Sequence, residues 1–326
     1  MKSTKFSNRA NRLIGQGMFQ VKVRAEEMER KGKRLLHFEI GDSYFDAPKQ
    51  VKKATIKAIK DNKTHYTDPK GIYELRKAIA EKHNVLVENV CVCPANFGIF
   101  ALLSVLCNKG DKVDYPVPGF PTYKAVCSYL GLKRGKKGKV TIINTPNNPT
   151  GKRIEKIKSK HTMGIFDFAY DEIQYIPQDE REISGAAFIY SFSKSHSMPG
   201  FRLGYVLSTS DVINKMGLLI ETTYSCLPEF IQWAGIEALK IREYKLEELR
   251  YKRNLMFDIL KKHYDIEKPE GAIYCWCKCK NGDKEFERLL EKGIVCCPGS
   301  IFGKKNYIRF CFAKSNEEIK RLGELL

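Results

Sequence analysis

The sequence lacks the long apolar runs and biased tracts that mark several protein classes. No apolar stretch approaches the roughly 20 residues that a membrane-spanning helix needs. Residues 1–15 are polar and basic and lack the apolar core of a secretory signal peptide. Internal repeats and low-complexity linkers are also missing, which argues against a repeat architecture. We therefore expect a globular protein of the cytoplasm.

Acidic residues are scarce relative to basic ones. The chain has 38 Asp and Glu against 57 Lys and Arg, so its net charge is +19. Such a field attracts phosphorylated substrates, nucleic acid or an acidic surface, and the alternative is a solvated, lysine-rich exterior. The lysine clusters at 133–139 and 152–160 contain no interleaved aromatic residues, so nucleic acid is an unlikely partner. The length of 326 residues and the 43% hydrophobic content favour a large core and two domains.

The 11 cysteines form no evident metal or disulfide framework. An odd number of thiols without a signal peptide is typical of a reducing cytosol. Cys275, Cys277 and Cys279 alternate along the sequence, which places them on one face of a strand. Cysteine there behaves as a small hydrophobic residue, so we favour a core role over a zinc site and expect no metal.

Short apolar strands alternate with helices along most of the chain. This order predicts an α/β domain with a mostly parallel sheet. We expect its strands at 36–41, 89–93, 112–115, 139–144, 163–168, 188–192 and 203–207, and helices at 51–60, 73–82 and 98–107. Residues 225–263 read as one long helical stretch. Strands at 273–279 and 307–312 then predict a small C-terminal α+β domain.

The run from Ser191 to Tyr205, SFSKSHSMPGFRLGY, is the most informative part of the sequence. Lys194 stands among serines after an apolar run, and Arg202 follows in a glycine-bounded segment. A lysine amine forms a Schiff base with an aldehyde cofactor, and serine and arginine hold a phosphate beside it. The run resembles the lysine motif of the class I/II pyridoxal-phosphate-dependent aminotransferases, which have fold type I and belong to the aspartate aminotransferase superfamily.

This resemblance implies a fold and a division into domains. The large domain of such enzymes holds pyridoxal 5'-phosphate on a mostly parallel, seven-stranded sheet, and a small α+β domain follows. We assign residues 1–40 to an N-terminal arm and helix of the small domain, residues 41–245 to the large domain, and residues 246–326 to the small domain. The implied cofactor linkage is an aldimine on Lys194, whose freed amine also serves as a general base.

Four residues resemble the family's contacts to the cofactor ring. Asp167, at the end of an expected strand, would keep the ring nitrogen protonated, because a nearby carboxylate favours a cation. Tyr170, three residues later, and Asn148, in a segment that ends Asn-Pro-Thr-Gly, match the groups that bind the phenolate oxygen. Phe120 matches the aromatic residue that stacks on the ring, and a plain core phenylalanine is the alternative.

The cofactor phosphate would be held by several segments. Ser191 and Arg202 match the family's phosphate ligands, and Ala95 and Asn96 occupy its phosphate loop before an apolar helix. Relatives usually have glycine and serine or threonine in this loop, so the sequence departs from the pattern here. Tyr66 resembles the tyrosine that reaches the phosphate of the neighbouring subunit, which implies a homodimer with shared sites.

Gly41, Asn148 and Arg309 match the positions that contact the substrate. The family holds the substrate α-carboxylate with an arginine in a strand like 307–312, and a structural ion pair is the alternative for Arg309. Two segments, 132–141 and 152–161, are shorter than in relatives, which would open the site. Together with the positive charge, this favours an anionic amino-acid or amine substrate, such as a phosphorylated one.

The leading functional hypothesis is an aminotransferase that moves an amino group from an amino acid to a keto or aldehyde acceptor. A decarboxylase or lyase acting on an amino acid would share the same lysine and fold. A non-catalytic protein that binds the cofactor or polyanions is a third hypothesis, which the intact Lys194, Asp167 and Arg202 disfavour.

Overall fold

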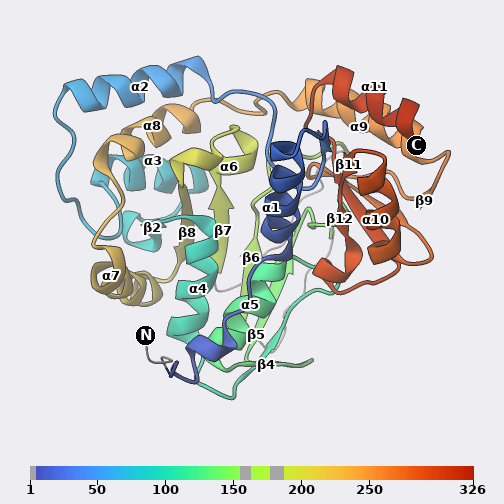
Figure 1. Ribbon diagram of the computed structural model, residues 1–326. Coiled ribbons are helices and arrows are strands. Elements are labelled where there is room, and N and C mark those ends of the chain that lie inside the picture. Colours follow the sequence, from blue (N-terminus) through green and yellow to red (C-terminus); the bar gives the residue numbers. More distant parts are fainter. Residues whose placement is uncertain (1–4, 155–162, 177–186) are drawn as a thin grey trace.

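A computed structural model describes residues 5–154, 163–176 and 187–326, and it has a large sheet-based part and a smaller C-terminal part (Figure 1). In the described residues, seven strands form one sheet in the order β2-β8-β7-β6-β5-β3-β4. These are β2 (Val90–Val92), β3 (Lys112–Asp114), β4 (Lys133–Arg134), β5 (Val140–Asn144), β6 (Met163–Asp167), β7 (Ala187–Ser191) and β8 (Gly204–Ser208). Only β8 runs antiparallel to its neighbours among these strands, so the expected mostly parallel sheet is confirmed.

Helices cover both faces of this sheet. One face is packed by α4 (Ala95–Leu106), α5 (Pro121–Leu130) and α7 (Ser210–Tyr224). The other is packed by α2 (Lys49–Lys60), α3 (Tyr73–His83) and α8 (Glu229–Leu239). Side chains of successive strand residues therefore enter different cores: Cys91 lies in the first, and Val90 and Val92 lie in the second. A parallel sheet that is buried on both faces explains why its strands read as continuous apolar runs.

The expected long helix over 225–263 is wrong. Two helices occupy this region, α8 and α9 (Leu246–Leu260). Glu243 and Lys245 between them have positive φ angles of 49° and 61°, which end the helical path. The break lets α8 pack against α2 and α3, while α9 packs against the small C-terminal sheet and α11 (Asn316–Leu325). The sequence has no proline or glycine at this break, so its local pattern still predicts a continuous helix. The packing of the two helices against different cores overrides that local preference.

The small C-terminal part is built on a second sheet. Its strand order is β12-β13-β10-β9, from β9 (Asp265–Ile266), β10 (Tyr274–Lys278), β12 (Cys297–Pro298) and β13 (Tyr307–Cys311). The helices α9, α10 (Gly282–Glu291) and α11 pack around it, and α1 (Gly17–Arg30) lies between it and the large part (Figure 1). Near α1, β1 (Leu36–His37) pairs in parallel with β11 (Ile294–Val295). Short helical turns complete the described chain: η1 (Ala10–Arg12), η2 (Val87–Asn89), α6 (Phe192–Ser195), η3 (Pro199–Phe201) and η4 (Gly299–Phe302).

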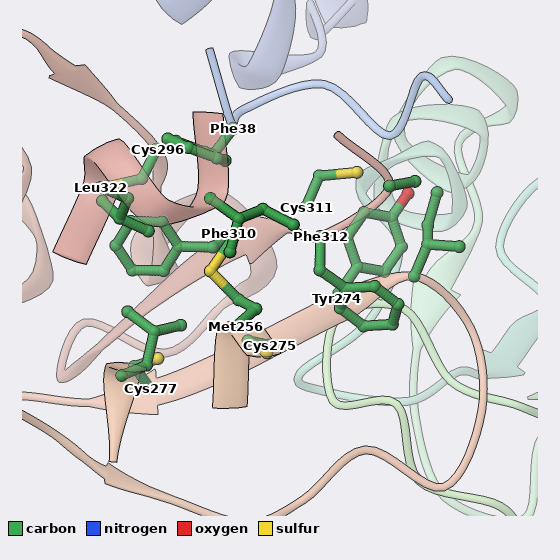
Figure 2. Packing of buried hydrophobic residues seen from close by; sticks show 14 of the residues in the cluster. Phe38, Met256, Tyr274, Cys275, Cys277, Cys296, Phe310, Cys311, Phe312 and Leu322 are labelled. Atoms are coloured by element: carbon green, nitrogen blue, oxygen red, sulfur yellow. The ribbon is translucent and has the colours of Figure 1, made fainter. Parts of the chain in front are cut away.

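Cysteines contribute to the core of the small part. Cys275 and Cys277 point into a cluster with Met256 and Phe310, beside Leu322 (Figure 2). Their alternation along β10 gives the one-sided placement that the sequence predicts. All 11 cysteines of the chain lie in the described ranges, and each is a free thiol. The described residues contain no cluster of His, Cys, Asp or Glu that could hold a metal ion.

The division of the chain at residues 40 and 245 stays a prediction. The packing is compatible with it, because Val21, Ala25 and Phe38 share one hydrophobic cluster with residues of α9 to α11. Of the two shortened segments, 132–141 contains only the two-residue strand β4 before β5 begins. Residues 155–161 of the second segment lie outside the described residues.

Candidate active site

A cavity of about 440 Å³ lies where three parallel strands end. Asn144, Asp167 and Ser191 are the last residues of β5, β6 and β7, and all three line it. Ligands of open α/β sheets usually bind at this carboxyl edge. Ten of the sequence-predicted residues line the cavity: Gly41, Ala95, Asn96, Phe120, Asn148, Asp167, Tyr170, Ser191, Lys194 and Arg202. The topology therefore brings together segments from six different regions of the sequence.

Lys194 projects from α6, the short helix that follows β7. Ser191 caps this helix by accepting a hydrogen bond from the Ser193 backbone N–H at 3.2 Å. The ammonium of Lys194 donates to the carbonyl oxygen of Gly41. Burial lowers the pKa of Lys194, because the protein interior disfavours the charged form. A lysine that is more easily deprotonated is a better nucleophile toward an aldehyde.

Asp167 is a buried carboxylate held by two hydrogen bonds. The Tyr123 hydroxyl donates to Oδ2 at 2.6 Å, and the Ala169 backbone N–H donates to Oδ1 at 3.0 Å. Burial raises the pKa of Asp167, and the bond from Tyr123 opposes that rise. Among the described residues, no Lys, Arg or His forms an ion pair with Asp167. A buried carboxylate without a protein cation fits a cationic ring, so the residue suits the ring nitrogen of pyridoxal phosphate.

The loop after β5 places Asn148 in the wall of the cavity. The Asn144 side chain accepts from the Asn148 backbone N–H at 2.8 Å and donates to the Asp167 carbonyl at 3.1 Å. Tyr170 lies beside this loop, and its hydroxyl shares a hydrogen bond of 2.7 Å with the hydroxyl of Tyr274. The two residues expected near the phenolate oxygen therefore face the same cavity as Asp167.

The phosphate end of the cavity has a helix N-terminus. Ala95 and Asn96 are the first residues of α4, and Pro94 before them supplies no side-chain cap. Their backbone N–H groups are thus available to an anion at the positive end of the helix dipole. Gly204 permits this arrangement, because a Cβ there would come within 2.5 Å of the Tyr190 carbonyl and 3.3 Å of the Ala95 nitrogen. Arg202 adds a guanidinium to the same wall.

Phe120 presents an aromatic side chain to the cavity at the start of α5. Its ring meets the ring of Tyr123 edge to face, with centroids 5.8 Å apart. This contact fixes the ring that we expect to stack on the cofactor. An amine, an acid, phosphate donors and an aromatic face are all present, so the residues fit the cofactor.

Arg309 lies behind the cavity wall rather than on it. The residue is fully buried, its Nη1 donates to Asn148 Oδ1 at 2.8 Å, and its Nη2 donates to the Glu39 carbonyl at 2.5 Å. Its guanidinium also stacks on Tyr274, 4.1 Å from the ring centroid. Among the described residues no carboxylate pairs with it, and its Nε has no hydrogen-bond partner. The structural ion pair is therefore not found among the described residues, and a buried cation whose charge no carboxylate there balances fits an anionic ligand.

Tyr66 lies outside the cavity. It is 88% exposed and belongs to the loop before α3. A role at the site of a neighbouring subunit requires this exposure, and that role stays a prediction.

Sequence reasoning missed several residues of the site. Tyr123 and Tyr274 hold Asp167 and Tyr170, and Met18 and Lys22 of α1 also line the wall. Tyr123 follows Phe120 by three residues in a proline-rich segment, which was a usable signal. No local pattern marks the others, since their proximity depends on long-range packing.

Comparisons with known proteins agree with this geometry. The profile of the family described as "Aminotransferase class I and II" matches residues 33–135 and 131–326. The (5-formylfuran-3-yl)methyl phosphate transaminase of Methanocaldococcus jannaschii is 31% identical, over 91% of this chain and 91% of that protein. The aspartate aminotransferase of Thermotoga maritima is 30% identical over 94% of this chain and 93% of its own length. A crystal structure of aspartate aminotransferase from Thermotoga maritima superposes with a TM-score of 0.91, at 26% identity and 98% coverage of both chains.

Proposed function

Because this chain belongs to the class I and II aminotransferase family and is a pyridoxal-phosphate-dependent aminotransferase, we propose roles for the residues that line its cavity. The observation that carries the proposal is that Lys194, with a lowered pKa, and the unpaired carboxylate of Asp167 face one cavity. The cofactor, when bound, supplies an electron sink for the bonds at the substrate Cα. Lys194 would hold the cofactor at its aldehyde carbon, and its amine would serve as the base for the proton at the substrate Cα.

The other residues of the cavity would bind the cofactor and orient the substrate. Asp167 would keep the ring nitrogen protonated, while Asn148 and Tyr170 would donate to the phenolate oxygen. Ser191, Arg202 and the start of α4 bind the phosphate. Asn148 also orients Arg309, which attracts the substrate α-carboxylate.

Borohydride reduction followed by peptide mapping tests the central assignment. We expect the reduced cofactor on the peptide that contains Lys194, and Lys194→Ala should abolish the label. The label on a different lysine would overturn the assignment. A panel of amino acids, followed through the cofactor spectrum, separates transfer from the lyase alternative. Conversion to the amine form of the cofactor indicates transfer, and release of carbon dioxide or a substrate fragment indicates a lyase.

We further propose that the substrate carries an anionic group beyond its α-carboxylate. The net charge of +19 and the relative that acts, by its name, on a phosphate-bearing aldehyde both support this proposal. A negative substrate would also be steered toward a positive protein. The kcat/KM for an anionic substrate should exceed that for its neutral isostere and should fall with added salt. Equal kcat/KM values for the two would refute it.

The proposed assembly is a homodimer with composite sites. Support comes from Tyr66, which is 88% exposed, and from exposed apolar residues such as Phe6 and Leu13 in the N-terminal arm. A second copy of the chain would cover such exposed apolar side chains. Sedimentation should give a dimer at micromolar concentration, and a fully active monomer would contradict the proposal.

The proposed location is the cytoplasm, where the free thiols of this chain would stay reduced. In the part of the chain that the structure describes, no helix is long and apolar enough to cross a membrane.

A further inference from the structure

Three cationic side chains line the cavity within the described ranges: Lys22, Lys194 and Arg202. Lys194 and Arg202 come from the motif that serves the cofactor aldehyde and phosphate. Lys22 comes from α1, a different part of the chain, and the proposed cofactor contacts leave it unused. It is thus the cation on this wall that remains for a substrate.

The N-terminal half of α1 is fixed against both parts of the molecule. The Gln16 side chain, at its N-cap, donates to Thr122 Oγ1 on α5 at 2.9 Å. A Cβ on Gly17 would come within 2.8 Å of Ile301, so the helix starts in close contact with η4. Arg24 binds both carboxylate oxygens of Glu287 on α10 at 2.6 Å. These contacts hold the helix at the cavity.

Lys22 lies one helical turn after Met18, and residues four apart share a face of a helix. Met18 is buried against Trp276 and Phe302, so the face that carries Lys22 begins in the wall of the site. The Lys22 side chain is 48% exposed, and its ion pair with Glu26 is long, at 3.6 Å. Exposed pairs of this kind are weak, so a stronger anionic partner can replace Glu26 at the ammonium.

The two acidic residues that line the cavity in the described ranges, Asp42 and Asp167, do not belong to α1. Asp167 is held by Tyr123 and the Ala169 backbone. Asp42 follows Gly41, whose carbonyl accepts the hydrogen bond from Lys194. No other Asp or Glu lines the cavity among the described residues. On the part of the wall formed by Gln16, Phe19 and Lys22, the charged side chain is therefore that of Lys22.

We propose that Lys22 determines substrate specificity by binding the distal anionic group of the substrate, a carboxylate or a phosphate. This inference rests on the proposed anionic substrate. Lysine binds such a group as a mobile point charge, so it can accept substrates of different lengths. A neutral substrate gains nothing from this residue.

The test compares wild-type holoenzyme with Lys22→Gln and Lys22→Arg. The substrates are L-glutamate with its neutral isostere L-glutamine, and O-phospho-L-serine with L-serine. Single-turnover kcat/KM is read from the cofactor spectrum. We expect Lys22→Gln to lose roughly 10–100-fold with the anionic substrates and less than twofold with the neutral ones, as for a charged hydrogen bond. Lys22→Arg should recover most of the loss.

Arg30→Gln is the matched control, because it removes an exposed charge at the end of the same helix that does not line the cavity. It should leave the preference for anionic substrates unchanged. If wild type shows no such preference, the proposed anionic substrate fails. If wild type prefers anions and Lys22→Gln keeps the full preference, the proposed substrate stands and the role of Lys22 is refuted.

Discussion

Replacing Tyr123 with phenylalanine should weaken catalysis without touching any residue of the lysine motif. The Tyr123 hydroxyl donates the 2.6 Å hydrogen bond to Asp167, and both side chains are buried. The variant leaves the carboxylate with the single bond from the Ala169 backbone among the described partners. A hydrogen bond to a charged group contributes about 1.5–3 kcal/mol. If that support acts in the transition state, kcat/KM should fall roughly 10–150-fold.

The pH profile adds a readout that a packing defect would not change. Burial raises the pKa of Asp167, and the bond from Tyr123 opposes that rise. Removing the bond therefore raises the pKa further. Because the ionised carboxylate is the working form, the acidic limb of the kcat/KM profile should move to higher pH.

Tyr115→Phe is the control, since its ring lies 6.4 Å from that of Tyr123 but its hydroxyl does not bind Asp167. The assay is the half-reaction with one amino acid, followed from pH 5 to 9 by the cofactor spectrum. A Tyr123→Phe enzyme with kcat/KM within twofold of wild type and an unmoved acidic limb would refute the reasoning.

Three further changes test other parts of the site. Asp167→Ala should retain cofactor but lose most of kcat, and an unchanged kcat would show that another group serves the ring nitrogen. Arg309→Lys loses the planar fork whose two nitrogens donate to Asn148 and the Glu39 carbonyl, so kcat/KM should fall about 10–100-fold, and full activity would contradict its role. Gly41→Ala would place a Cβ 1.9 Å from the Tyr274 hydroxyl, so the melting temperature and activity should both drop, whereas Gly200→Ala, with nothing within 4 Å and no positive φ, should leave the melting temperature unchanged.

The sequence predicts the parts of this site that sit at strand ends or within a motif. The segments around Lys194, Asp167 and Asn148 each follow an apolar strand, and parallel strands bring their carboxyl ends to one edge. Local order along the chain is sufficient information for these residues.

The features of the site that the sequence does not predict depend on contacts between segments that are distant in the chain. The Tyr170–Tyr274 bond joins residues 104 apart, and the bond from Arg309 to Asn148 joins residues 161 apart. No periodicity encodes such separations, so the position of Arg309 behind Asn148 was not foreseen. The break between α8 and α9 was missed for a related reason, because it is set by the two cores that those helices join.

The buried cysteines of the small C-terminal part allow thiol labelling to detect local unfolding of this protein. Eight of the 11 thiols are buried, and Cys107, Cys226 and Cys279 are partly exposed. Burial raises the pKa of Cys275, Cys277 and Cys296, so the reactive thiolate is scarce in the folded state. An alkylating reagent should therefore modify up to three positions quickly and the remainder only when the packed interior separates. The mass distribution of the labelled chains then shows how many buried thiols become accessible together. It therefore distinguishes unfolding of the small part alone from unfolding of the whole molecule.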